Sequence, residues 1–394
     1  MSRSTDHPWL HRFALLTALA TLALLGIGGL VTSHGVGMAV PDWPTTYGYN
    51  MFLFPISKWV GGIFYEHSHR LVASGVGLLT TILAVWLWLA ESRRWLRWLG
   101  VIAFFAVVIQ GVLGGLRVVL FKDQIGIFHA TLAQLFFALV CAIALFTSKW
   151  WLLNFPALVN PPLTSPRRGT EKGARPLRSS PPGRGQEWVS SSAATTKLGR
   201  LFLLTTILIF LQLVLGATMR HQHAGLAIPD FPLAYGKLWP VMDAEAVAGY
   251  NQRRLETTAT NPITAFQIGL QMAHRLMAAG ILICVSAVAW RVRSSGFSWS
   301  GPPEGGTPNP LRRLAFAWLT LVLVQAGLGA WTVWSNKAAD VATAHVLVGA
   351  LSLVTGVVGC LISFRRFTGN VEIPAASASS EVSCGGRVSV GANS

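Results

Sequence analysis

Charged residues are scarce in this chain of 394 residues, where they make up 12% of the total. Soluble globular proteins carry about 25% charged residues, so a compact water-soluble protein with a polar surface is excluded. Acidic residues are the scarcest, with 15 Asp and Glu against 31 Lys and Arg, a formal net charge of +16. This surplus would suggest a nucleic-acid partner in a soluble chain. In a membrane chain it marks the cytoplasmic loops, so we expect no nucleic-acid partner.

Cysteine is also scarce. Cys141, Cys284 and Cys360 lie inside apolar stretches, and Cys384 lies in the C-terminal tail. Four cysteines in these places cannot form a disulfide framework or a cysteine metal site.

Apolar residues, in contrast, make up 52% of the chain. An apolar run of about 20 residues is long enough to cross a bilayer as a helix. Eight such runs occur, at residues 13–31, 60–90, 96–118, 124–147, 199–219, 263–290, 312–334 and 341–363. The first resembles a signal peptide, but no small-x-small cleavage site followed by a polar domain comes after it, so we expect a retained helix. We therefore predict an all-α integral membrane protein with eight transmembrane helices.

The basic residues predict the orientation of these helices. If the N-terminus is cytoplasmic, about two thirds of the Lys and Arg residues fall on the cytoplasmic side, as the positive-inside rule requires. An even number of spans returns the C-terminus to the same side. We expect a multi-pass protein of a bacterial inner membrane with both termini in the cytoplasm.

Composition divides the chain into four segments. Residues 1–155 and 199–366 each hold four apolar runs and are predicted to form two four-helix halves. Residues 156–198 are basic and rich in Pro, Ser and Gly, which predicts a disordered cytoplasmic linker. Residues 367–394 are predicted to be a disordered tail.

The two halves carry the same short motifs in the same order, which indicates an internal repeat. The matching segments are Pro41-Asp42-Trp43-Pro44 with Pro229-Asp230-Phe231-Pro232, His69-Arg70-Leu71 with His274-Arg275-Leu276, Gln110-Gly111-Val112-Leu113-Gly114 with Gln325-Ala326-Gly327-Leu328-Gly329, and His129 with His345. Because four spans separate the copies, both copies have the same orientation. The repeat predicts two pseudo-symmetric bundles related by an axis along the membrane normal.

Four histidines recur in this repeat: His69 and His129 in the first half, His274 and His345 in the second. Each is placed in the outer third of its span. Two histidines at similar depth on neighbouring helices can supply both axial ligands of a haem iron. A single buried histidine is as well explained by a hydrogen bond to a neighbouring carbonyl, but four in a repeated pattern favour two haem-sized sites.

An arginine directly follows the first histidine of each pair. Arg70 and Arg275 could bind haem propionates, because a guanidinium pairs bidentately with a carboxylate. Snorkelling toward the membrane interface is the alternative. Arg117 and Arg220, at outer ends of spans, are weaker candidates of the same kind.

One position differs between the halves in a chemically informative way. Glu66 lies three residues before His69, where a helix places both on one face, whereas the matching residue in the second half is the uncharged Gln271. The two halves thus hold an acidic and a neutral version of the same site. This difference predicts that the first half carries out chemistry and that the second half holds a permanent cofactor. The alternative is that Glu66 balances the charge of Arg70 or His67.

This ordered set of motifs resembles the haem A synthase family over residues 13–363. The resemblance implies a membrane enzyme that oxidises the C8 methyl group of haem O to the formyl group of haem A for terminal oxidases. It implies that His69 and His129 face the haem O substrate, that Glu66 is the acid/base group, and that His274 and His345 ligate a haem b cofactor. Some members carry a cysteine pair in the first outer loop, but this chain has none between residues 32 and 68. Haem O synthase, oxidase assembly factors, membrane lipid and a second copy of the chain are the expected partners.

Two other functions remain open from the residues. A dihaem cytochrome b-type quinol electron carrier would use four histidines but has no need for the difference between Glu66 and Gln271. A secondary transporter built from repeats would need polar groups at mid-depth, and these histidines lie further outward.

Overall fold

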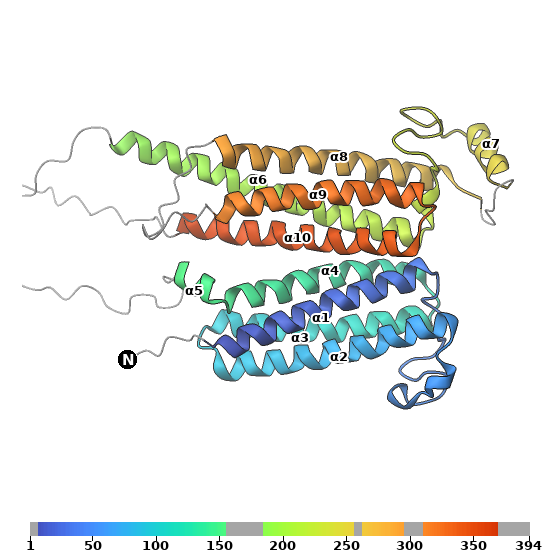
Figure 1. Ribbon diagram of the computed structural model, residues 1–394, viewed down its shortest axis with the longest axis horizontal. Coiled ribbons are helices and arrows are strands. Elements are labelled where there is room, and N and C mark those ends of the chain that lie inside the picture. Colours follow the sequence, from blue (N-terminus) through green and yellow to red (C-terminus); the bar gives the residue numbers. More distant parts are fainter. Residues whose placement is uncertain (1–6, 155–183, 256–261, 295–309, 369–394) are drawn as a thin grey trace, which may run out of the picture.

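The computed structural model describes residues 7–154, 184–255, 262–294 and 310–368. These residues are helical apart from the loops and two isolated β-bridges, and no β-strand occurs among them. Figure 1 shows two bundles of long helices lying side by side, with α7 and the longest described loops at one end.

The first bundle contains four long helices, with short helical segments in the loop after the first and after the fourth. Its elements are α1 (Pro8–Ser33), η1 (Met51–Leu53), η2 (Ile56–Lys58), α2 (Gly61–Ala90), α3 (Arg94–Val119), α4 (Asp123–Phe146) and α5 (Lys149–Asn154). The second bundle follows the same plan. Its elements are α6 (Arg184–His221), η4 (Ala224–Leu226), α7 (Ala244–Leu255), α8 (Ala265–Ser294), α9 (Pro310–Trp334) and α10 (Ala339–Thr368).

Eight of these helices are long and apolar enough to cross a membrane, which confirms the predicted number of spans. Their limits differ from the prediction at two places. Helix α1 begins at Pro8 rather than near residue 13, because proline is favoured in a first helical turn. Helix α6 begins at Arg184, so the last part of the predicted linker is helical, although the apolar part of the helix starts only at Lys197. No proline lies between Arg184 and Lys197 to stop the helix from extending.

The rest of the predicted linker and nearly all of the predicted tail lie outside the described residues. The parallel relation of the two halves and the cytoplasmic position of the termini stay predictions.

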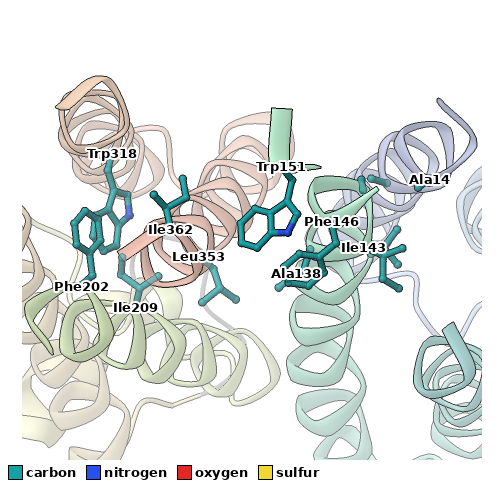
Figure 2. Packing of buried hydrophobic residues seen from close by; sticks show 14 of the residues in the cluster. Ala14, Ala138, Ile143, Phe146, Trp151, Phe202, Ile209, Trp318, Leu353 and Ile362 are labelled. Carbon is teal, nitrogen blue, oxygen red and sulfur yellow. The ribbon is translucent and has the colours of Figure 1, made fainter. Parts of the chain in front are cut away.

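The two bundles share one hydrophobic core. Helices α1 and α4 contact α10, and α4 also contacts α6. Figure 2 shows buried side chains running from one bundle to the other, with Trp151 of α5 between Leu353 of α10 and Phe146 of α4. In the second bundle the rings of Phe202 and Trp318 stack, with centroids 5.5 Å apart. Buried aromatic contacts of this size hold the helices, and with them the four histidines, in fixed relative positions.

A buried ion pair ties three helices together at the end far from the histidines. Glu91 and Arg93, in the short connection between α2 and α3, lie 2.7 Å apart, and Arg93 also donates to the Phe146 carbonyl at the end of α4 (3.0 Å). The pair is almost fully buried, so each charge depends on the other.

Candidate functional site

The four predicted histidines all lie in the first third of long helices. His69 is on α2, His129 on α4, His274 on α8 and His345 on α10. The rings of His274 and His345 have centroids 6.4 Å apart, and His69 and His129 are close enough to interact electrostatically. The structure therefore brings the histidines together in the two pairs that the sequence predicted.

The distance between His274 and His345 is too large for a direct hydrogen bond between the rings. It leaves room for one atom bonded to both imidazoles, because metal–imidazole bonds are about 2 Å long. This geometry fits a metal held between two axial histidines.

Each histidine ring packs against a glycine of a neighbouring helix. If a Cβ atom were added to these glycines, its distance to the histidine Cε1 would be 3.0 Å for Gly28 and His69, 3.3 Å for Gly114 and His129, 3.4 Å for Gly216 and His274, and 3.1 Å for Gly329 and His345. Small residues let helices approach closely at such points. The glycines therefore limit how each ring can turn. Gly114 and Gly329 belong to the repeated motif, whereas no sequence argument had identified Gly28 and Gly216.

Three of the four histidines have a buried ring nitrogen without a hydrogen-bond partner among the described residues. In His69, His129 and His274 this atom is Nδ1. Buried polar atoms are usually hydrogen-bonded, so an unpaired imidazole nitrogen indicates that a further group binds here. Unpaired imidazoles are also the donors that haem iron takes as axial ligands.

His345 differs, because Gln325 contacts both of its nitrogens. Nδ1 lies 3.1 Å from the Gln325 carbonyl, and Nε2 lies 3.3 Å from the Gln325 side-chain amide. The carbonyl contact orients the ring, as a ligand histidine requires. Coordination through Nε2 would require the Gln325 side chain to turn away.

Two further glutamines reach from one helix to the backbone beside a histidine. Gln110 of α3 donates to the His129 carbonyl (3.0 Å), and Gln212 of α6 donates to the His274 carbonyl (2.9 Å). Gln110 opens a repeated motif, but Gln212 was missed by the sequence analysis. Gln212 could have been identified from the sequence as a lone amide inside an apolar span, because polar side chains in such spans usually form hydrogen bonds between helices.

Glu66 is buried on the His69 side of α2 and is 3% exposed. Its carboxylate accepts hydrogen bonds from the Val40 backbone N–H (2.8 Å) and from Arg70 (2.7 Å). The pairing with Arg70 is the alternative that the sequence left open. Gln271 is equally buried and accepts from the Ile228 backbone N–H at 2.7 Å.

Arg70 and Arg275 bind loop carbonyls in this structure. Arg70 donates to the carbonyls of Val40, Asp42 and Thr45 at 2.7–3.1 Å. Arg275 donates to the carbonyls of Asp230 and Leu233 at 2.7 and 2.9 Å. Both arginines thus fasten the loop before a helix to the helix that carries a histidine, and their contact with propionates stays a prediction.

The repeated Pro-Asp-aromatic-Pro motif forms the same loop in both halves. Asp42 accepts from the backbone N–H groups of Tyr47 (2.8 Å) and Gly48 (2.9 Å), and Asp230 accepts likewise from Tyr235 and Gly236. Both aromatic–Pro bonds are cis. Partial burial acts to raise the pKa of Asp42, but hydrogen bonds from Gly48, Thr45 and Tyr47 outweigh it, so the pKa lies below its ordinary value.

The first loop also reaches the helix that faces His129. A Cβ atom on Gly115 of α3 would lie only 2.3 Å from the Trp43 ring. The side chain of Trp43 therefore packs directly on the α3 backbone, one residue beyond the glycine that faces His129.

The chain is similar to a family of known proteins over most of its length. The model of the family described as "Cytochrome oxidase assembly protein" matches residues 11–357. A protein of Geobacillus kaustophilus named "Heme A synthase" is 27% identical over 379 residues, which cover 92% of this chain and 94% of that protein. Proteins of the same name from Shouchella clausii (29% identity, 61% of this chain and 69% of that protein) and Agrobacterium fabrum (27%, 79% and 71%) are also similar.

Proposed function

Because the chain belongs to the family of cytochrome oxidase assembly proteins, we propose that it is a haem A synthase of the bacterial cell membrane. In this role it is an oxidoreductase that converts the C8 methyl group of haem O to the formyl group of haem A for a cytochrome oxidase. The observation that carries the proposal is the presence of two histidine pairs of matching construction, only one of which has a buried carboxylate beside it.

We assign the haem O substrate to the first half. There His69 and His129 are close enough to interact electrostatically, and Glu66 lies three residues before His69 on α2. The site lies among membrane-spanning helices, so the hydrophobic tail of haem O can remain in the lipid.

We assign a resident haem b to the second half, with His274 and His345 as its axial ligands. The bound haem supplies electron transfer, and the protein supplies ligation, position and a low-dielectric surrounding. In place of Glu66 this half has the neutral Gln271, which cannot exchange a proton at physiological pH.

The residues around Glu66 are suited to hold and move a proton near the outer surface. Arg70 stabilises the ionised carboxylate by a charge-assisted hydrogen bond, and the Val40 N–H fixes its second oxygen. Val40 itself is fully buried, so the loop that it belongs to separates Glu66 from bulk water. A carboxylate in this position can accept a proton released when the substrate methyl group is oxidised.

The proposal is tested by analysing the pigments of membranes from cells that make haem O and express this chain. We expect haem A to appear in the extract, together with one haem b per purified chain. Two stoichiometric b haems and no haem A would instead identify a dihaem electron carrier.

A further inference from the structure

Arg220 joins the two bundles close to the second histidine pair. It lies in the last turn of α6, and its Nη2 donates to the Gly29 carbonyl (2.8 Å) and to Ser33 Oγ (2.7 Å), both on α1. Ser33 Oγ is also 3.3 Å from the hydroxyl of Thr343, two residues before His345. Helices α1, α6 and α10 therefore meet at this arginine.

Lys337, in the turn between α9 and α10, is close enough to Arg220 to interact with it electrostatically. Asn336 and Lys337 both have left-handed backbone conformations, with φ values of 52° and 64°, and the Lys337 N–H bonds to the Thr332 carbonyl. Residues other than glycine adopt this conformation at a cost, so the turn is held by its surroundings. Burial, and then the charge of Arg220, lower the pKa of Lys337 below its ordinary value.

Neither cation forms an ion pair with any carboxylate whose side chain the structure describes, a set that leaves out Asp123 at the start of α4, although both cations are partly buried. The Arg220 charge also acts on the ring of His345. Two adjacent cations withdrawn from water are unfavourable unless an anion joins them. Only Nη2 of Arg220 is engaged with α1, and the rest of the planar guanidinium can pair with a carboxylate.

We propose that Arg220 and Lys337 form a carboxylate-binding site at the junction of the two bundles, occupied by a propionate of the haem that His274 and His345 hold. This inference rests on the proposed function, because it requires a haem in the second half. The two halves share the lysine of this site but differ in the arginine. Lys122 lies in the matching turn of the first half, and its N–H bonds to the Arg117 carbonyl as that of Lys337 bonds to the Thr332 carbonyl. Gly28 of α1 faces His69 as Gly216 of α6 faces His274. Arg220 lies four residues after Gly216, so the matching residue of α1 is Thr32, four residues after Gly28. The Thr32 hydroxyl bonds to the Gly28 carbonyl of its own helix.

A carboxylate bound here would link the haem of the second half to the contact between the bundles. The guanidinium that holds the propionate is itself bonded to α1, so release of this haem would leave both cations without that carboxylate.

The test uses the full chain in a His69→Ala/His129→Ala background, which confines haem to the second half. Protein from cells unable to make haem is titrated with haem b and with haem b dimethyl ester, which lacks free carboxylates, and binding is followed by the Soret band. We expect haem b to bind roughly tenfold more tightly than the ester, a difference of about 1.4 kcal/mol, because the ester cannot form the charge-assisted hydrogen bonds.

Three variants locate the effect. Arg220→Gln and Lys337→Gln should each weaken haem b binding by roughly tenfold and leave ester binding unchanged. Lys237→Gln, at an exposed lysine of the outer loop, should change neither. Lys337 makes no bond to α1, so its variant separates anion binding from helix packing, and unchanged ester binding shows that each variant is folded.

The outcomes separate the two proposals. Equal binding of haem b and its ester overturns the carboxylate site but leaves the haem b assignment standing. In a further outcome, haem b and its ester bind equally, inorganic phosphate stabilises the protein, and Arg220→Gln abolishes this stabilisation. That result would assign the site to a free anion and overturn the proposal that a propionate occupies it. Binding of neither ligand overturns the haem b assignment and this inference with it.

Discussion

At the scale of single residues, Glu66 and Gln271 show that folding does not require an acid at this position. Both side chains are buried and both accept a hydrogen bond from a loop N–H, at 2.8 Å from Val40 and 2.7 Å from Ile228. An amide therefore can accept the loop N–H in place of a carboxylate. The charge of Glu66 pairs with Arg70, and we take it to serve proton transfer as well.

Replacing Glu66 by Gln should keep the bond to the Val40 N–H, lower the stability because Arg70 loses its charged partner, and remove the chemistry. We expect Glu66→Gln to retain haem b but to form haem A at least about 100-fold more slowly, the usual range for loss of an acid/base group. Chromatography of extracted haems measures both. Glu245→Gln, at an exposed acid of α7, serves as the control. Wild-type haem A production by Glu66→Gln would rule out the acid/base role.

Asp42 gives a pH dependence whose sign follows from its hydrogen bonds. Its pKa in the folded loop lies below the ordinary value of 3.8, so its stabilising effect is complete above that value and is lost as the pH falls through the folded pKa. We expect the protection of the Tyr47 and Gly48 amides, relative to the intrinsic exchange rate at each pH, to fall in that acid range. In Asp42→Asn the protection should already be reduced at neutral pH, because one amide oxygen replaces two carboxylate oxygens, and it should show no acid transition.

At the scale of helices, the sequence predicted which segments span the membrane but not how their side chains pair. Apolar length alone identifies the eight spans, because a bilayer imposes it. The bonds of Arg70 depend on a loop 25–30 residues earlier in the chain folding back onto α2, and no local pattern encodes this. The role of Gln212 likewise depends on contact between α6 and α8. The pairing of histidine with histidine could be predicted from the sequence because the repeat supplied a second copy of each motif.

The glycines that face the histidines are the most direct test of helix packing. A Cβ atom at Gly28 would lie 3.0 Å from His69 Cε1, so the larger side chain of Gly28→Val should displace the ring. We expect loss of haem from the first half, retained haem b in the second, and a free energy of unfolding lower by about 1–3 kcal/mol. Gly75→Val on α2 is the matched control, because nothing lies within 4 Å of its Cβ position. Full occupancy of both sites in Gly28→Val would contradict the packing described for His69.

At the scale of the whole molecule, the shared core makes the relative position of the two bundles part of the site. Besides Arg220, the junction contains Gly126 of α4, where an added Cβ atom would lie 2.4 Å from Cε1 of His221 on α6. Because His221 is buried, neither its ring nor the α4 backbone at Gly126 can move far.

A bulky residue at Gly126 should therefore separate the bundles without touching any of the four histidines. We expect Gly126→Val to keep both haems, to unfold at a lower temperature with a loss of about 1–3 kcal/mol, and to make less haem A. Gly280→Val on α8, whose Cβ position is open, should match the wild type in thermal unfolding and pigment content. If Gly126→Val behaved like Gly280→Val, the bundles would not depend on each other.

The shared depth of the four histidines has an electrical consequence. All four lie in the first third of helices that start at the same end of the bundles, so a line between the two pairs runs along the plane of the membrane. A charge that crosses the whole membrane changes its energy by about 2.3 kcal/mol per 100 mV, but one that moves within the plane crosses almost none of the field. An electron passing between the two sites would be nearly indifferent to the membrane potential, and the energised state of the cell would neither drive nor oppose it.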